Sequence, residues 1–504
     1  MTVYEKDFTV PEWIKGGIIY QIFPDRFYNS GQVKTNVPTD RYINDNWQKE
    51  PEYRQSDDLC TLGNDYYGGD LKGIKDKLPY LKDLGVNCIY LNPIFEAHSN
   101  HRYNTADYLK IDYLLGNDSD LEKLCREAKK LGIYIILDGV FSHTGDDSVY
   151  FNRKMRYGQT GAYNDENSPY RSWYKFGNHK DDYASWWGIK TLPEVDENND
   201  NFSEFITGEK GVIRHWMKKG VKGFRLDVAD ELPDEFLDKI RLSIKSEDKD
   251  GFLLGEVWED ASNKISYGAR RRFIRGRQLD SVMNYPFANV IIEFVRSGNS
   301  QILVDTVFEI LENYPKFVTD VLMNHIGTHD TARALTRLVL GDGNSSRRAE
   351  ESGVRLDEYQ YNLAKKYLYI AAVLQYTLPG VPSLYYGDEA GMQGFGDPFC
   401  RGAYPWGNED AEILDFYKKL GDIRRNSSAY VNGNFEILYN DGGVLIFSRF
   451  DGDFKAVTIV NRSGSDFEFS VKDLFKKSVD CFGGIIIGDA VTVEKNGYSI
   501  MVEK

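Results

Sequence analysis

The chain has 504 residues, enough for two or three domains of ordinary size. Hydrophobic residues make up 41% of it and aromatic residues 14%, which is ample for a large buried core. The formal net charge of −15 argues against nucleic acid or an anionic membrane surface as a partner.

The cysteines and the first residues bear on the cellular compartment. The five cysteines include no C-x-x-C pair, which favours reduced thiols over a disulfide framework or a zinc site. The opening MTVYEKDFTV has no basic and apolar signal region, and no apolar run is long enough to cross a bilayer. We therefore expect a cytoplasmic protein, or a secreted one if a signal was trimmed. The cysteines are Cys60, Cys88, Cys125, Cys400 and Cys481.

Eight short apolar runs recur along the chain, and most precede a helical pattern such as DLEKLCREAKKLG or GVIRHWMKKG. Strand–helix alternation predicts parallel strands, and eight units predict a closed (β/α)8 TIM barrel in the α/β class. A doubly wound open sheet is the alternative, but no Gly-rich phosphate turn follows the first run. The runs begin at Gly17, Val86, Ile133, Gly223, Phe252, Leu279, Val321 and Pro382.

Two stretches interrupt this alternation. Residues 143–201 are rich in Tyr, Trp, Asn, Asp and Gly, and they indicate a small subdomain inserted after the third strand. Residues 426–504 contain β-rich runs such as GGVLIFSRF and FKAVTIVNRS separated by turns, which predicts a C-terminal β-sandwich. The barrel would then comprise residues 1–142 and 202–425.

The stretch GFRLDVADEL places two charges inside a strand that should be buried. Arg225 and Asp227 are two residues apart, so they share one face of the strand, opposite Phe224 and Leu226. Buried charges are costly unless paired. An ion pair inside the barrel would account for these two residues alone.

The ends of the other strands are also polar. In a barrel of this kind the reacting groups lie at the carboxyl ends of the strands. Carboxyl groups that converge there with an arginine and two histidines favour an active site, because ionisable residues are rarely buried without a task. These strand-end residues are Asp138, His143, Arg225, Asp227, Glu256, Trp258, His329 and Asp330.

Three carboxyl groups without a Cys or His cluster favour glycoside hydrolysis over metal-assisted hydrolysis. One group must be ionised to attack, and we expect the Arg225 cation to lower the pKa of Asp227. Another must begin protonated, and the apolar neighbours of Glu256 are expected to raise its pKa.

These motifs resemble those of the α-amylase family (glycoside hydrolase family 13), most closely the neopullulanase and cyclomaltodextrinase group. The resemblance covers the whole chain. The ordered set of motifs is specific where a single one would be weak. The motifs are GGIIYQIFPDRF, HRYNTADY, DGVFSHTG, LPEVD, GFRLDVADE, GEVW, IGTHDTAR and GVPSLYYGDEAGM.

The resemblance implies a role for each site residue. Asp227 would be the nucleophile, Glu256 the general acid/base, and Asp330 the carboxylate that grips sugar hydroxyls. The remaining residues would contact the substrate: Tyr103 would stack beneath the sugar at the cleavage point, and a pair in DPFCR would hold the neighbouring sugar. Those implied contacts are Tyr103, His143, Arg225, His329, Asp397 and Arg401.

The chain departs from the family pattern around the metal positions. Ser142 and Asp230–Glu231 replace expected partners of the family's central calcium. A second calcium position, with Asn29 and Asp70 as candidate ligands, is half retained, although its acidic loop here is NSGQVKTN. We expect no required cofactor, with oxygen-ligated calcium as the one candidate ion. The N-terminal sandwich on which that group dimerises is missing, so a monomer is expected.

The sequence therefore predicts a retaining hydrolase that cleaves α-1,4 bonds of maltodextrins or starch through a covalent bond to Asp227, with an α-glucan as its partner. An intracellular α-glucosidase or transglycosylase on the same fold is the alternative. A catalytically silent relative is the rival from another class, and the presence of all three carboxyl groups argues against it.

Aromatic residues are dense in the inserted segment close to LPEVD. Trp173, Tyr174, Trp186 and Trp187 would bind sugar faces if they are exposed. The alternative is that they form the core of a short subdomain with few aliphatic residues.

Overall fold

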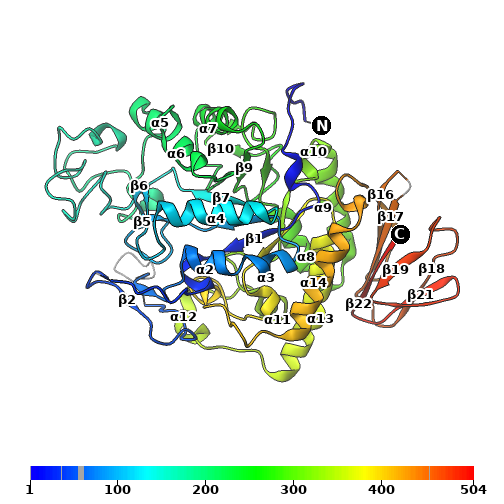
Figure 1. The fold of residues 1–504 in the computed structure, drawn as a ribbon. Coiled ribbons are helices and arrows are strands. Elements are labelled where there is room, and N and C mark those ends of the chain that lie inside the picture. The colour runs from blue at the N-terminus through cyan, green and yellow to red at the C-terminus, as the bar shows by residue number, and fades with distance from the viewer. Residues whose placement is uncertain (1, 36, 55–61, 453, 504) are drawn as a thin grey trace.

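The structure is a computed structural model that describes residues 2–35, 37–54, 62–452 and 454–503. Figure 1 shows a helix-covered barrel with a β-rich part at the C-terminus. Cys60 lies outside the described residues. The other four cysteines are free thiols, three of them buried, which agrees with the prediction for these four.

The barrel contains all eight predicted strands, each parallel to its neighbours in chain order. The first strand pairs with the last, and a parallel bridge between Met283 and Met323 joins the sixth to the seventh, so the sheet closes. The TIM-barrel prediction is confirmed. The strands are β1 (Ile19–Ile22), β4 (Cys88–Leu91), β7 (Tyr134–Gly139), β8 (Gly223–Leu226), β9 (Phe252–Gly255), β12 (Ser281–Val282), β13 (Met323–His325) and β14 (Val381–Tyr385).

Helices cover the outside of the barrel (Figure 1). In α4, Leu121, Leu124, Cys125 and Ala128 form one buried stripe, and the Asn117 side chain caps the first turn. The helices are α1 (Pro24–Phe27), α2 (Leu71–Asp76), α3 (Leu78–Asp83), α4 (Asp118–Lys130), α5 (Asp200–Thr207), α6 (Val212–Lys218), α7 (Asp234–Glu247), α8 (Tyr285–Ser297), α9 (Ser300–Asn313), α10 (Lys316–Thr319), α11 (Ala334–Leu340), α12 (Arg348–Glu351), α13 (Glu358–Thr377) and α14 (Ala411–Arg425).

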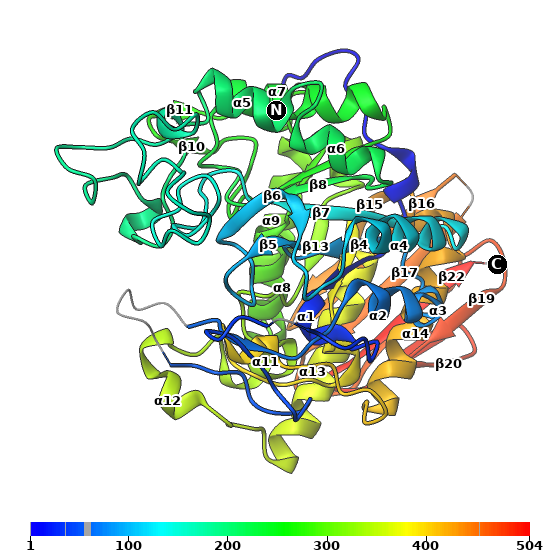
Figure 2. The ribbon, with the colours of Figure 1, turned by 60° about the vertical axis from the view of Figure 1, so that its left-hand side comes forward.

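The loops of the barrel contain additional strands. The segment between β7 and α5 consists of turns, two short 3-10 helices and isolated bridges. Figure 2 shows this segment projecting to one side of the barrel. The loop strands are β2 (Tyr42–Ile43), β3 (Asp65–Tyr66), β5 (Phe95–Ala97), β6 (Thr105–Ile111), β10 (Ile265–Ser266) and β11 (Ala269–Arg270). The 3-10 helices are Glu12–Ile14, Arg171–Trp173, Trp186–Gly188, Ser345–Arg347, Asp388–Ala390, Phe399–Arg401 and Ser428–Tyr430.

The C-terminal part contains an antiparallel sheet of five strands and another of three, consistent with the predicted β-sandwich. Val444, Ile446, Val457, Ile459 and Val491 belong to its own buried cluster. The residue limits given above for the barrel, insert and sandwich stay predictions. The strands are β15 (Asn434–Asp441), β16 (Val444–Asp451), β17 (Phe454–Asn461), β18 (Phe467–Ser470), β19 (Val479–Phe482), β20 (Ile485–Ile487), β21 (Ala490–Val493) and β22 (Gly497–Glu503).

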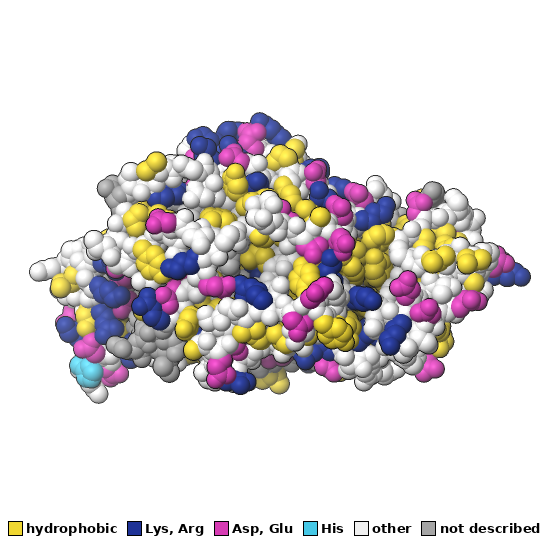
Figure 3. All heavy atoms as spheres, turned by 90° about the horizontal axis from the view of Figure 1, so that it is seen from below, with side chains coloured by type: hydrophobic (Ala, Val, Ile, Leu, Met, Phe, Trp, Pro, Cys, Tyr) yellow, Lys and Arg dark blue, Asp and Glu magenta, His cyan; other side chains and the backbone are white. Residues whose placement is uncertain are grey.

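The surface carries both signs of charge. On the face shown in Figure 3, acidic and basic side chains are interspersed with small apolar areas. Within the described ranges, no helix has the length and apolar character that crossing a membrane requires.

Candidate active site

Arg225 on β8 is the centre of a buried cluster at the barrel mouth. Its Nη1 lies 2.7 Å from Asp138 Oδ1 and 2.8 Å from Asp227 Oδ1, and its Nη2 lies 2.7 Å from Glu256 Oε2. All four side chains are buried. The two charges of GFRLDVADEL are therefore one part of a larger cluster rather than an isolated ion pair.

The carboxyl group of Glu256 is held at both oxygens. The backbone N–H of Val228 donates to Oε2 at 2.9 Å, beside the Arg225 contact. The indole N–H of Trp258 donates to Oε1 at 3.2 Å, and the Tyr285 hydroxyl lies 3.5 Å from the same atom. The rings of Trp258 and Tyr285 stack with centroids 4.1 Å apart, so one oxygen faces charge and the other faces aromatic donors.

A chain of hydrogen bonds fixes Tyr103, on the loop between β5 and β6. Gln21 Nε2 donates to His329 Nδ1 at 2.8 Å, which leaves the ring proton on Nε2, 2.6 Å from the Tyr103 oxygen. The Tyr103 hydroxyl then donates to Asp138 Oδ2 at 2.8 Å. The Tyr103 and His329 rings stack with an interplanar angle of 7°, which fixes the half-buried Tyr103 ring at the site, and its stacking on a sugar stays a prediction.

Asp330 lies at the rim of the cluster and is its most exposed carboxyl group. Arg401 Nη2 is 3.2 Å from Asp330 Oδ1, and Arg401 Nη1 is 2.7 Å from Asp397 Oδ1. His329 Nε2 lies 3.1 Å from Asp330 Oδ2. Asp397 and Arg401 thus form an ion pair that extends to Asp330, and their contact with the neighbouring sugar stays a prediction.

His143 is buried and already has partners. Its Nδ1 lies 3.0 Å from the Ser142 hydroxyl and its Nε2 3.1 Å from the Tyr103 carbonyl oxygen. The ring lies 5.4 Å from that of Trp186. These contacts place His143 between Tyr103 and the inserted segment, and its contact with sugar stays a prediction.

Burial raises the pKa of the carboxyl groups in the cluster, and Arg225 opposes that shift. The raised pKa of Glu256 agrees with the expectation. For Asp227 the expectation was a lowered pKa, but burial and the neighbouring Glu256 and Asp138 outweigh Arg225 and raise it. Arg225 contacts three carboxyl groups but carries a single positive charge. The cluster therefore favours a state in which at least one of these carboxyl groups keeps its proton.

The calcium candidates Asn29 and Asp70 do not fit a metal ion. Asp70 Oδ2 pairs with Lys34 Nζ at 2.6 Å and accepts from Ser30 at 2.8 Å, while Oδ1 caps α2 through the Gly73 N–H. Asn29 Oδ1 accepts from the Gly31 N–H. Calcium requires about six to eight oxygen ligands. Among the described residues, no group of three Asp, Glu, His or Cys side chains could hold a metal.

The aromatic residues of the insert divide into two sets. Trp173 and Tyr174 are buried, and Trp173 packs against Phe202 and Phe205 with ring centroids 5.2 Å apart. For these two the core alternative is correct. Trp186 is half-buried and Trp187 is 80% exposed, as a binding role requires.

Several residues that contact the cluster were not predicted from the sequence. Tyr90 donates to Asp138 Oδ2 at 2.6 Å, Asn92 donates to the Tyr103 hydroxyl at 2.9 Å, and Gln21 holds His329. All three lie at the carboxyl ends of β1 and β4, so the strand-end rule could have found them. Tyr285 ends the predicted sixth run, so the same rule applies to it.

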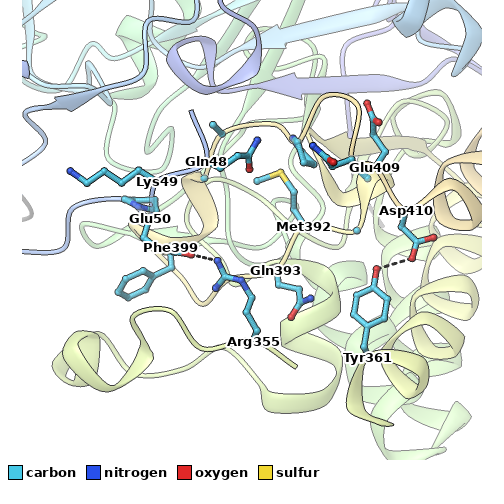
Figure 4. Close-up of a pocket in the computed structure, with 17 residues that line it drawn as sticks. Gln48, Lys49, Glu50, Arg355, Tyr361, Met392, Gln393, Phe399, Glu409 and Asp410 are labelled. Carbon is cyan, nitrogen blue, oxygen red and sulfur yellow. Dashed lines mark hydrogen bonds and ion pairs between the residues drawn. The ribbon is translucent and has the colours of Figure 1, made fainter. Parts of the chain in front are cut away.

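A separate cavity of about 390 Å³ lies behind the loop that carries Arg401. Figure 4 shows Tyr361 beside Asp410 at one end and Arg355 near Glu50 at the other. Its lining includes Phe399 but none of the cluster's carboxyl groups. The cavity is therefore separate from the cluster.

Comparison with known proteins places these features in one family. The family model of the α-amylase catalytic domain matches residues 21–426 of the sequence. The cyclomaltodextrinase of Thermoanaerobacter pseudethanolicus is 34% identical, over 91% of this chain and 72% of the relative. The amylopullulanase of Thermoanaerobacterium saccharolyticum is 37% identical over 97% of this chain, which spans 41% of that protein.

A solved structure shares nearly the whole architecture. The ligand-free cyclic α-maltosyl-(1→6)-maltose hydrolase from Arthrobacter globiformis aligns with a TM-score of 0.79 and 27% identity, covering 98% of this chain and 99% of that one. The chain spans less than half the length of the amylopullulanases that it matches.

Proposed function

Because the chain belongs to the α-amylase family, we propose that it is a retaining hydrolase of α-1,4-linked glucans that acts on maltodextrins or starch. The observation that carries the proposal is the shared guanidinium of Arg225. It contacts both Asp227 and Glu256 and so keeps the two carboxyl groups close together. Retaining glycosidases need such closeness, about 5–5.5 Å between the two groups.

Asp227 is the nucleophile in this account. Arg225 holds Oδ1, which leaves Oδ2 to attack the anomeric carbon. A bond forms between Asp227 and that carbon as the glycosidic C–O bond breaks, which gives a covalent glycosyl–enzyme intermediate. Asp227 has a short side chain and directly follows β8, which limits its movement during attack.

Glu256 is the general acid and then the general base. Arg225 and the Val228 N–H occupy Oε2, so the proton is carried on Oε1 and passes to the leaving oxygen. In the second step Glu256 takes a proton from water, which attacks the anomeric carbon and releases Asp227. Burial raises the pKa of Glu256, as the acid role requires.

The rim residues bind the sugar. Asp330 accepts hydrogen bonds from hydroxyl groups of the sugar that reacts, and Arg401 with Asp397 binds its neighbour. Tyr103 supplies a flat ring for the apolar face of the sugar. The partner is therefore an α-glucan chain. We also propose that the protein is a monomer, and light scattering would measure its oligomeric state.

A product profile tests this function. Purified protein should release maltose or short maltodextrins from starch or cyclodextrin, and short fragments that keep an α-1,6 bond from pullulan. Release of glucose alone from chain ends would favour the α-glucosidase alternative, and longer products at high maltose concentration would favour the transglycosylase. No cleavage of any of these substrates would contradict the proposal.

A further inference from the structure

A groove of about 580 Å³ lies next to His143, on the side of the inserted segment. Its walls are the insert, the turn after β8 and the β10–β11 hairpin, and Ser142 beside His143 lines one end. These segments follow β7, β8 and β9. In the closed barrel those strands lie across from β13 and β14, whose loops carry Asp330 and Arg401.

Two exposed aromatic side chains from different segments line this groove. Trp187 lies on the insert and is 80% exposed, and Tyr267 lies on the hairpin and is 81% exposed. Both have a left-handed backbone, with φ of 50° and 51°. Across the described chain, no other aromatic residue has a positive φ.

The hairpin turn itself does not explain a tyrosine at position 267. Tyr267 is the first residue of a two-residue turn whose second residue is Gly268 at φ 78°, a position that normally favours Asn, Asp or Gly. Exposure of a large ring to water and a positive φ at a non-glycine residue are both unfavourable for folding. Backbone outliers of this kind cluster at functional sites.

A carboxylate outside the insert holds the two tryptophan rings of the insert in place. Glu231, in the turn after β8, accepts from Trp186 Nε1 at 2.7 Å and from Trp187 Nε1 at 2.8 Å. The two indoles stack with centroids 5.5 Å apart, and Trp186 lies 5.4 Å from His143. The rings of His143, Trp186 and Trp187 therefore form a row, and His143 contacts Tyr103, whose hydroxyl donates to Asp138 of the cluster.

We propose that Trp187 of the insert and Tyr267 of the hairpin bind an α-glucan chain in this groove, beyond the glucose units held at the catalytic cluster. The inference rests on the proposed function and adds a preference for long chains. A glucan is neutral and its sugar faces expose apolar C–H groups, which pack on flat rings. Lys175, Glu194 and Asn198, also in the groove, can hydrogen-bond the hydroxyl edges.

The test compares a long substrate, maltoheptaose, with a short one, maltotriose. Trp187→Ala and Tyr267→Ala should each lower kcat/KM for maltoheptaose about fivefold, equivalent to about 1 kcal/mol of lost binding, and leave maltotriose nearly unchanged. Tyr267→Asn should show the same loss while its melting temperature holds or rises, because Asn suits the turn. Ile265→Ala is the matched control, since Ile265 is 68% exposed on the same hairpin but outside the groove lining.

Equal losses on both substrates, or none, would overturn the inference, and so would a lower melting temperature with an unchanged long-to-short ratio. Calorimetry of maltoheptaose binding, with Asp227→Asn as the background for each variant, separates this inference from the proposed function. Weaker binding in the Trp187 and Tyr267 variants supports the groove even if the parent protein cleaves nothing. Unchanged binding contradicts the groove even if cleavage occurs.

Discussion

The backbone N–H of Val228 donates a 2.9 Å hydrogen bond to Glu256 Oε2, and it does so from a residue with φ of 39°. A positive φ is an outlier for a β-branched residue, and strain of this kind amounts to about 1–3 kcal/mol. Val228 directly follows Asp227. The strained peptide thus links the proposed nucleophile to the proposed acid/base.

Val228→Gly is expected to relieve this strain and lower activity. Glycine adopts positive φ freely, and the half-buried Val228 side chain gives up little packing, so the melting temperature should hold or rise. The looser peptide would no longer fix Glu256, and kcat should fall. Calorimetry and kcat measure the two effects. A large drop in melting temperature with unchanged kcat would show that the strain is not functional.

Asp227→Asn should abolish turnover while the fold and glucan binding persist. The amide keeps the shape but cannot attack, and loss of a nucleophile lowers kcat by several orders of magnitude. Arg225 would still contact Asp138 and Glu256. Asp230→Asn, three residues on and paired with Lys264 at 3.2 Å outside the cluster, is the matched control and should keep near-normal activity. A near-normal rate for Asp227→Asn would refute the assignment.

Chelators should leave the wild-type melting temperature unchanged, because the Lys34 ammonium pairs with Asp70 where a calcium ligand set was expected. Both side chains are largely buried, so loss of Lys34 leaves an unpaired carboxylate. Lys34→Asn should therefore be destabilised, and added calcium should restore part of its melting temperature. Lys72→Asn, on the neighbouring helix, serves as the control. A wild-type protein that loses stability in EDTA would contradict this account.

Glu389 should make stability depend on pH. Burial raises its pKa to about 7, although it accepts hydrogen bonds from Tyr20 and Tyr80 at 2.5 and 2.8 Å. A raised pKa means that the folded state binds the proton more tightly than the unfolded state. Its contribution to stability is full below the unfolded pKa of about 4.3 and is lost as pH rises through about 7.

The melting temperature of the wild type should therefore fall between pH 5 and pH 8 more than that of Glu389→Gln, whose amide cannot titrate. Thermal melts across that range measure the difference. Parallel curves for the two proteins would argue that Glu389 does not titrate there.

The barrel was predictable because each of its strands is a short apolar run with a polar end. Arg225 and Asp227 stood out because a buried strand rarely carries charge, and their strand-end position placed them correctly. The pKa of Asp227 could not be predicted, since it depends on Glu256 and Asp138 brought close by three different strands. Likewise, Lys34 meets Asp70 across a loop, a contact that no local pattern encodes.

The aromatic insert shows the same limit. Composition alone could not separate Trp173, which packs on Phe202 and Phe205 from α5, from Trp187, which stays exposed. The hairpin with Tyr267 gave no signal, because its strands are only two residues long.

The anomeric configuration of the first product tests the central claim most directly. Attack by Asp227 and then by water inverts the anomeric carbon twice, so an α-linked glucan should give an α-anomer. Proton NMR during the first minutes of maltoheptaose hydrolysis resolves the two anomers before mutarotation mixes them. An α-anomer is the result that the shared contacts of Arg225 with Asp227 and Glu256 predict. A β-anomer as the first product would contradict a covalent intermediate on Asp227.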